Sequence, residues 1–598
     1  MRDEGRGEPQ YDTKERLIER NIDEKRDESR FGIHYKWIAL SNTTLGALMA
    51  SIDSSILMIS LPAIFNGLNV NPLAPGATDL LLWLLLGYII MSSVTVVTIG
   101  RLSDMFGRVR LYNMGFAIFS FASILVYVSS YIISGSAGIL SLTLLRLLQG
   151  LGGGFLFANG AAILTDAFPE NERGMAMGFN AIAIVGGSII GLLVGGVLSA
   201  IDWHLIFLIS VPVGVLGTVW AYVGLHELAS IRKNQKIDVF GNVTFAVSLT
   251  IILLALTYGI EPYGNQSTGW SNPAVEISLI AGIILFIAFI AVERIVKDPM
   301  FHLDLFRIKV FAYGNLALLL SGMARGGLQF MIIIWLQGIW LPLHGVSFIN
   351  TPLQAGIDML PLIIGFLVSG PISGHLSDKY GSRKFATAGM LINFFGFLFL
   401  ASMPANFNYL PFGIAIFMLG VGQGMFTSPN TAMVMSAVPP EYRGISSGMR
   451  ATLVNVSFMF SLAVFFSLLV VGVSLNLQPS LYNGVLAQNV SQPTALAISK
   501  LPASSALFAA LLGYNPIKSL VNQTVLSTLS AHDTSIILGT DFFSNLLAVP
   551  FKSGMQIVMY AGALMALFAA IFSAINFDAS RSRPGLKDGD QQPKPAVA

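Results

Sequence analysis

Fourteen stretches of mainly apolar residues run through the chain, each long enough to cross a bilayer as a helix. A helix needs about 20 residues to span the hydrocarbon layer. This pattern predicts an all-α integral membrane protein with fourteen transmembrane helices. The stretches lie near 37–64, 80–100, 111–133, 139–165, 174–199, 203–225, 239–260, 275–293, 310–341, 353–374, 384–402, 409–437, 445–473 and 554–577.

Positive residues mark one side of the predicted membrane segments. The turns after helices 1, 3, 5, 7, 9 and 11 contain no Lys or Arg, whereas the alternate turns carry Arg108, Arg173, Arg232 and Lys379 among others. Because Lys and Arg collect in cytoplasmic loops, we expect both termini to be cytoplasmic. The localisation expected for such a multi-pass protein is the cell (plasma) membrane.

A charged string occurs twice and indicates an internal duplication. The stretch 101–108 recurs at 375–383 with an offset of 274 residues, and 168–174 is echoed at 438–444 with an offset of 270. A nearly constant offset indicates two related halves, and paired halves in an apolar chain are typical of transporters. The expected units are a cytoplasmic tail 1–36, a six-helix bundle 37–225, two inserted helices in 226–309, a second six-helix bundle 310–577 and a cytoplasmic tail 578–598.

The second bundle contains a long extracytoplasmic loop, 474–553. Its apolar segments, such as 506–512, are too short to span, so we expect amphipathic helices lying on the outer face. The loop could serve as a lid or a surface for a partner, or it could only cover the end of the bundle; the sequence leaves both alternatives open.

Composition narrows the function classes. Of 598 residues, 54% are hydrophobic and 11% are charged, against about 25% charged in soluble chains. A net charge of +2 without a basic, aromatic-rich patch gives no reason to expect a nucleic-acid partner. The histidines are not paired at metal-ligand spacing, and no phosphate or dinucleotide loop is present. We therefore expect no metal, cofactor or enzymatic activity, and no oligomer is implied.

Asp53 lies midway along the first predicted helix. An ionised carboxylate at that depth costs roughly 2.5–3.5 kcal/mol on insertion scales, so it needs a purpose or a partner. A carboxyl there can hold a proton in one conformation and release it in another, and it can attract a cationic substrate. The alternative is a structural Asp bonded to a neighbouring helix.

Arg325 lies in the middle of the ninth predicted helix, where the repeat offsets place the equivalent of Asp53. We therefore predict that Asp53 and Arg325 form a breakable ion pair across a central cavity. The alternatives are that Arg325 pairs with Asp358 or reaches water. A positive charge in the cavity would weaken the binding of cations, so an anionic or zwitterionic substrate is an alternative.

Several motifs together resemble the major facilitator superfamily and, within it, the fourteen-helix drug:proton antiporters. The resemblance covers most of the membrane part, in order, but not the tails or the loop 474–553. It departs at Leu192, where the antiporters have proline, and at His204, where arginine is usual. The matching stretches are Gly100 to Arg108, Ile52 to Pro62, Arg146 to Gly150, Trp203 to Gly214 and Pro352 to Pro361.

The resemblance implies the major facilitator fold and a role in proton coupling for Arg146, with Gln149 one turn along the same helix face. An arginine keeps its proton, so Arg146 acts as a fixed charge; the alternative is a side chain that reaches the outer headgroups. The resemblance also implies a cytoplasmic gate formed by charged residues in two turns. The alternative is that these charges only determine the orientation of the chain in the membrane. The residues of this gate are Asp104, Gly107, Arg108, Asp378, Gly381 and Arg383.

Glycines recur about every four residues on the fifth predicted helix, at Gly187, Gly191, Gly195 and Gly196. Such spacing allows close helix packing, and the resemblance implies that it also limits proton leak.

The predicted function is proton-coupled efflux (antiport), by alternating access, of amphipathic, cationic drugs or metabolites. The partners are a small-molecule substrate, protons and the lipid bilayer. The alternatives are a facilitated or proton-coupled carrier of a small metabolite and a membrane receptor or scaffold that carries no flux.

Overall fold

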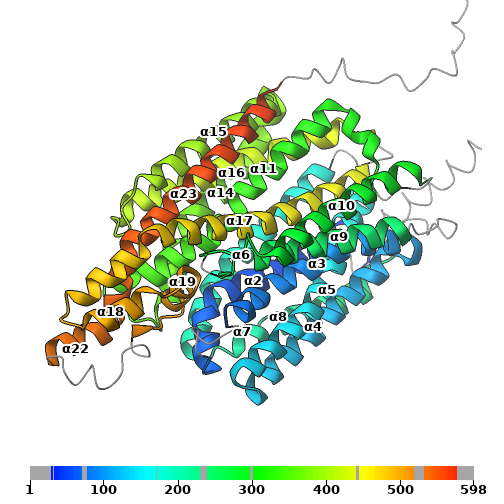
Figure 1. Ribbon diagram of the computed structural model, residues 1–598. Helices are drawn as coiled ribbons and strands as arrows, with labels where there is room; N and C mark the ends of the chain where they lie inside the picture. The colour runs from blue at the N-terminus through cyan, green and yellow to red at the C-terminus, as the bar shows by residue number, and fades with distance from the viewer. Residues whose placement is uncertain are drawn as a thin grey trace, which may run out of the picture.

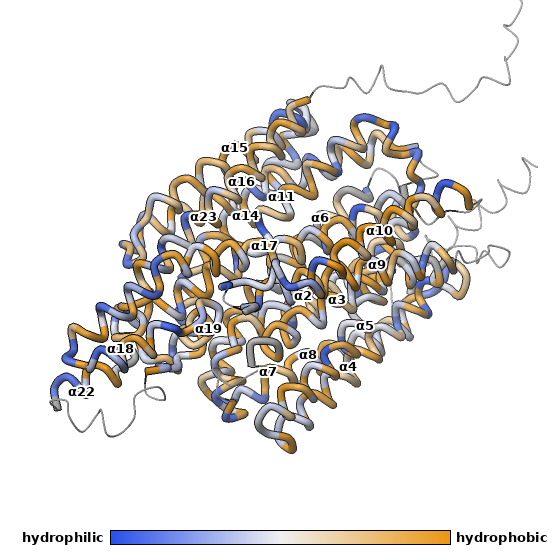
Figure 2. Tube along the Cα trace, viewed as in Figure 1, coloured by the Kyte–Doolittle hydropathy of each residue, from blue (hydrophilic) through white to orange (hydrophobic). Residues whose placement is uncertain are grey.

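A computed structural model describes residues 29–30, 33–70, 77–169, 172–228, 239–264, 266–296, 299, 301–439, 443–517 and 531–575. Within them, fourteen helices are long and apolar enough to cross a membrane, which confirms the predicted all-α membrane fold. Figure 2 shows apolar residues along the lengths of these helices. A short antiparallel pair, β1 (Ser29–Arg30) and β2 (Ile33–His34), precedes the first helix.

The N-terminal half is a bundle of membrane-spanning helices. Its sixth span is divided into two helices, α7 and α8. The first span, α2, contains a proline, Pro62, within the helix. The helices are α2 (Tyr35–Gly67), α3 (Ala77–Phe106), α4 (Arg108–Ile132), α5 (Gly135–Ala167), α6 (Arg173–Ile201), α7 (Leu205–Leu208) and α8 (Ser210–Gly224).

Two helices lie between the halves in the sequence, α9 (Val239–Tyr258) and α10 (Pro273–Ile295), followed by a 3-10 turn, η1 (Leu303–Arg307). Asn272 caps α10 by accepting from the backbone N–H of Ala274 at 3.0 Å. The two helices pack on each other, and α9 also touches α3 and α17.

The C-terminal half repeats the bundle with two especially long helices, α17 and α23, and a π-helical turn, η2. Its elements are α11 (Lys309–Ile334), η2 (Trp335–Trp340), α12 (Leu341–Leu343), α13 (Thr351–Asp358), α14 (Leu360–Tyr380), α15 (Ser382–Ala401), α16 (Tyr409–Ser436), α17 (Arg443–Leu486), α18 (Gln492–Ser499), α19 (Ala503–Leu511), α22 (Ala531–Leu538) and α23 (Thr540–Ala574). Figure 1 shows α14, α15, α16 and α23 grouped apart from α3, α4, α5 and α8.

The two ends of the molecule differ. We call the end that carries α18, α19 and α22 the loop side and the opposite end, where α23 finishes, the terminus side (Figure 1). One apolar core joins both halves toward the loop side, running from Ile56 and Leu85 through Trp335 to Phe551. Toward the terminus side each half has a separate cluster, around Tyr112 in one and Phe311 in the other. In the described residues, apolar packing therefore holds the halves together mainly at the loop side.

The segment 474–553 differs from the expected surface helices. α17 continues to Leu486 and α23 already begins at Thr540, so the intervening segment is shorter than predicted. α19 is buried almost all round rather than amphipathic. It packs on η2, where a Cβ placed on Gly338 would lie 3.5 Å from Cβ of Ala510. The expectation of an amphipathic helix lying on the surface is therefore wrong for α19, although α19 does lie at the loop side.

Candidate functional site

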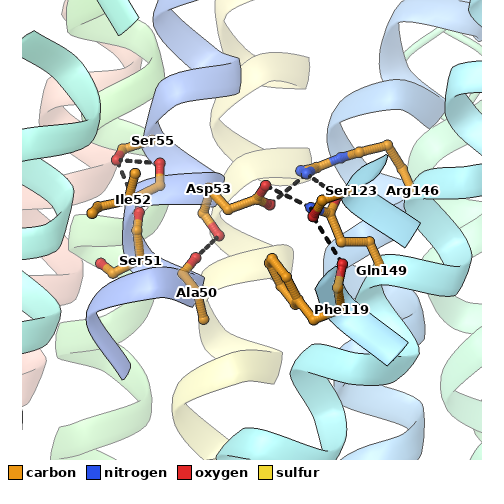
Figure 3. A network of polar contacts seen from close by, with 10 residues as sticks. Ala50, Ser51, Ile52, Asp53, Ser55, Phe119, Ser123, Arg146 and Gln149 are labelled. Atoms are coloured by element: carbon orange, nitrogen blue, oxygen red, sulfur yellow. Dashed lines mark hydrogen bonds and ion pairs between the residues drawn. The ribbon is translucent and has the colours of Figure 1, made fainter. Parts of the chain in front are cut away.

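Asp53 lies near the middle of α2 and is held by side chains of α5 (Figure 3). Arg146 donates through Nη1 to Asp53 Oδ2, which forms an ion pair. Gln149 donates through Nε2 to Asp53 Oδ1 at 2.8 Å and to Ser123 Oγ of α4 at 2.8 Å. Nη1 of Arg146 also donates to Oε1 of Gln149 at 2.6 Å. Both carboxylate oxygens of Asp53 therefore accept from α5. We call Asp53, Ser123, Arg146 and Gln149 the Asp53 cluster.

The Asp53 cluster is closed off from its surroundings. Asp53 and Arg146 are each 1% exposed, and Gln149 is 0% exposed. The guanidinium carbon of Arg146 lies 4.7 Å from the ring centroid of Tyr88 on α3, a distance at which the ring face attracts a cation. Arg146 is thus buried in the bundle, and the alternative in which it reaches the headgroups is wrong.

Small residues on α6 set the position of α2 and so of Asp53. A Cβ on Gly187 would lie 2.8 Å from the carbonyl oxygen of Leu48, and one on Gly191 would lie 2.6 Å from that of Ile52. A Cβ on Gly195 would lie 2.6 Å from Cγ2 of Ile59. These glycines let two backbones approach closely.

The fourth glycine of the motif makes a different contact. A Cβ on Gly196 would lie 2.5 Å from Cα of Leu353 on α13, so Gly196 packs against the other half of the molecule. One glycine motif thus serves both the packing within the N-terminal half and the contact between halves.

The Asp53 cluster can couple the uptake of a proton by Asp53 to the loss of its ion pair with Arg146. A buried pair keeps its charges only while both are present, because one charge left alone in a low-dielectric site is costly. Arg146 cannot give up its proton, so Asp53 is the member that can change charge. The described residues contain no group of three or more His, Cys, Asp or Glu side chains suited to a metal ion.

The predicted pair between Asp53 and Arg325 is not formed. Asp53 binds Arg146 of its own half, and Asp358, the alternative partner, accepts from Gln354 at 3.1 Å. Equal depth in two helices does not fix which way their side chains face. Arg325 is exposed on α11.

The two predicted gate turns share a backbone feature. Gly107 and Gly381 have backbone φ angles of 102° and 93°, which residues other than glycine rarely adopt. A Cβ on Gly107 would also meet Oε2 of Glu227 at 2.9 Å, whereas nothing lies within 4 Å of one on Gly381. The side chains of Asp104 and Asp378 lie outside the described residues, and Arg383 is exposed.

Asp166 and Glu227, which the sequence did not single out, hold the start of α4 on the terminus side. Arg108 donates through Nη1 to both carboxylate oxygens of Asp166, at 2.8 and 2.7 Å. Glu227, just after α8, accepts from the backbone N–H groups of Arg108 and Val109 at 2.9 and 3.0 Å. Burial raises the pKa of Glu227, although these two hydrogen bonds act in the opposite direction. The missed acids connect the gate turn to α5 and α8.

A family comparison explains this architecture. The pattern of the Major Facilitator Superfamily matches residues 43–336, 302–462 and 351–586. The chain belongs to the Major Facilitator Superfamily. It is a multi-pass membrane transporter.

Curated relatives of this transporter differ in their printed roles. It is 28% identical over 435 residues to the riboflavin transporter RibZ of Clostridioides difficile (strain 630), covering 72% of this chain and 88% of the relative. It is 27% identical to multidrug resistance protein 3 of Bacillus subtilis (strain 168), covering 70% and 77%. The multidrug transporter protein MdtP of Bacillus subtilis (strain 168) is 24% identical, with 94% and 96% covered.

Solved structures support the fold. A peptide transporter POT in complex with sulfate superposes with a TM-score of 0.54 at 15% identity, covering 84% of this chain and 99% of that one. At this identity the likeness concerns the fold alone.

Proposed function

We propose that this transporter is a proton-coupled antiporter that exports amphipathic small molecules, as the fourteen-helix drug:proton antiporters do. The observation that carries the proposal is the Asp53 cluster, in which the single titratable acid is bound on both oxygens by two α5 side chains. The relatives named for multidrug resistance and multidrug transport support the substrate class.

Protonation of Asp53 removes the charge that holds Arg146. The ion pair between α2 and α5 then becomes an ordinary hydrogen bond beside an uncompensated guanidinium, which favours a rearrangement of the two helices. Deprotonation restores the pair. Alternating access follows if substrate and proton occupy the molecule in opposite phases of this cycle.

We also propose that the terminus side is cytoplasmic and that the protein resides in the plasma membrane. In the described state the apolar core joins the halves at the loop side, so substrate would enter from the cytoplasm. The positive residues of the alternate turns support this orientation.

The test uses purified protein in vesicles with an imposed pH gradient and a dye whose charge does not change with pH. We expect wild-type vesicles with an acidic lumen to accumulate the dye as protons leave. Asp53→Asn should lower this accumulation at least about tenfold, a loss of about 1.4 kcal/mol of coupling, while dye exchange at equal pH persists. Asp304→Asn is the matched control, because Asp304 is 80% exposed in a surface pair with Arg307.

The outcome separates the candidate functions. Undiminished accumulation by Asp53→Asn would contradict the assigned proton site. A carrier of a small metabolite is the second candidate, supported by the relative named as a riboflavin transporter. A proton symporter would accumulate substrate only with an alkaline lumen, a facilitator would show exchange without accumulation, and a receptor would show neither.

A further inference from the structure

A second polar cluster occupies the repeat-equivalent place in the C-terminal half. Gln423 is the counterpart of Gln149 at an offset of 274 residues, and Asn393 is the counterpart of Ser123 at an offset of 270. Oε1 of Gln423 accepts from Ser321 Oγ at 3.2 Å and from Asn393 Nδ2 at 3.4 Å. The same glutamine position therefore ties helices together in both halves.

The charges of the two clusters differ. The position equivalent to Asp53 is occupied by Arg325, and the position equivalent to Arg146 is occupied by Gly420. No side chain fits at Gly420, because a Cβ there would overlap the carbonyl oxygen of Leu362. The N-terminal cluster is a balanced pair, whereas the C-terminal one contributes a single positive charge.

Arg325 lies on α11 between the contacts that this helix makes with α16 and with α17. One turn earlier on α11, Ser321 binds Gln423 of α16, and a Cβ on Gly322 would overlap Oγ of Ser457 on α17. Arg325 lies on the helix strip between these two contacts. Further along the same span, in η2, Gln337 donates to the carbonyl oxygen of Ile59 on α2 at 3.3 Å.

The exposure of Arg325 is not explained by contact with lipid. A charged side chain at mid-membrane depth faces a bundle interior or water, since contact with hydrocarbon costs several kcal/mol. Arg325 is exposed although Ala324 and Leu328 beside it are each 3% exposed. Within the described part of the chain, no ion pair or hydrogen bond of the Arg325 side chain is recorded. The two mid-depth acids nearest in role, Asp53 and Asp358, already accept from Gln149 and Gln354.

A second arginine lies on the terminus side of Arg325. Arg450 of α17 shares a helix face with Ser457, two turns away, and Ser457 is level with Gly322 of α11. The two arginines are thus separated by about 15 Å along the helix axes at 1.5 Å per residue. Arg450 donates through Nη2 to Thr431 Oγ1 at 2.8 Å, while its buried Nη1 has no hydrogen-bond partner among the described residues.

We propose that Arg325 binds an anionic group of the transported molecule, a carboxylate, phosphate or sulfonate, at mid-depth between the halves. Arg450 adds a positive field on the terminus side that attracts the same group. Because Asp53 is neutralised by Arg146, the described charges favour an anionic or zwitterionic amphiphile over the cationic one expected from the sequence. The proposal specifies the substrate class of the proposed transport function and rests on it.

The test measures binding without any proton gradient, so that it stays separate from coupling. Purified protein in detergent is titrated with three related xanthene dyes: anionic carboxyfluorescein, zwitterionic rhodamine B and cationic rhodamine 6G. We expect the anionic and zwitterionic dyes to bind more tightly than the cationic one. Arg325→Gln should weaken binding of carboxyfluorescein about tenfold or more, as expected for loss of a charged hydrogen bond, and leave binding of rhodamine 6G unchanged or stronger.

Two further variants control for folding and for general charge. Arg325→Lys retains the positive charge and should restore part of the affinity for the anion. Arg294→Gln makes the same chemical change at an exposed position at the end of α10 and should bind all three dyes like the wild type. Tighter binding of the cation, equal binding of all three dyes, no binding of the anion, or an anion affinity unchanged in Arg325→Gln would each overturn the proposal. Failure of Asp53→Asn to affect gradient-driven flux, with this dye selectivity intact, would overturn only the proton coupling.

Discussion

At the scale of residues, the Asp53 cluster holds opposite charges that differ in what they can do when separated. Asp53 can take up a proton and become neutral, whereas Arg146 stays charged. Removing Asp53 and removing Arg146 should therefore lower the free energy of unfolding by different amounts, although both substitutions break the same ion pair.

We predict that Asp53→Asn destabilises the protein more than Arg146→Gln does. Replacing the carboxylate of Asp53 by an amide leaves the buried guanidinium of Arg146 without a counter-charge, which costs about 3 kcal/mol or more. In Arg146→Gln the carboxyl escapes most of that cost by protonation. Melting temperatures of the purified variants, read from intrinsic fluorescence, measure the difference.

The double variant provides the control. Asp53→Asn with Arg146→Gln carries neither charge and should melt close to Arg146→Gln alone, so the two effects should not add. Additive losses in the double variant, or a larger loss in Arg146→Gln, would show that the cluster does not act as one charged unit.

The sequence identified three members of the Asp53 cluster but not their arrangement. Asp53 stands out because a carboxylate is rare in an apolar stretch, whereas Arg146 and Gln149 were identified through the family resemblance of their helix. Their contact depends on how α2 rotates against α5, which depth along the helix does not specify, so the repeat offsets led to the wrong partner, Arg325. Ser123 was missed because a serine in a membrane helix is unremarkable until Gln149 points at it.

At the scale of elements, helix lengths exceed what hydropathy predicts. α17 has 44 residues, about 66 Å at 1.5 Å per residue, more than twice the ~30 Å of hydrocarbon. Polar residues end an apolar stretch without ending a helix, so 474–486 was predicted as loop. The burial of α19 could not be predicted either, because its apolar residues pack against η2, a partner far away in the sequence.

The glycine motif of α6 gives a prediction at this scale. Gly191→Ala should destabilise the protein or block transport, because its Cβ would overlap Oγ of Ser55 and lie 2.6 Å from the backbone oxygen of Ile52. Backbone cannot move aside without shifting α2. The cost expected for such overpacking is about 1–3 kcal/mol, measurable as a lower melting temperature.

Gly186→Ala is the matched control on the same helix. Nothing lies within 4 Å of a Cβ at Gly186, and alanine favours the helical conformation over glycine by up to about 1 kcal/mol. We therefore expect Gly186→Ala to be neutral or slightly stabilising. Equal losses from both substitutions would show that α6 responds to added volume in general and not to its contact with α2.

At the scale of the whole molecule, the hydrophobic pattern was sufficient for the number of spans, and several motifs read in order were sufficient for the superfamily. Neither specifies the state of the molecule. The shared core at the loop side and the separate clusters at the terminus side depend on contacts between halves, such as Gly196 with Leu353. Those contacts join helices that are far apart in the sequence, so no pattern local to one helix specifies them.

A disulfide across this junction tests whether it opens during transport. A Cβ on Gly356 of α13 would lie 3.7 Å from Cβ of Leu192 on α6, within the ~3.5–4.5 Å typical of disulfides. The natural chain has no cysteine, so Leu192→Cys with Gly356→Cys gives a single possible bond. We expect oxidation to stop net flux in vesicles and reduction to restore it, because the halves can no longer separate at the loop side. Each single variant should be indifferent to the oxidant, and full flux through a protein shown by mass spectrometry to be crosslinked would mean that the loop-side junction stays closed throughout the cycle.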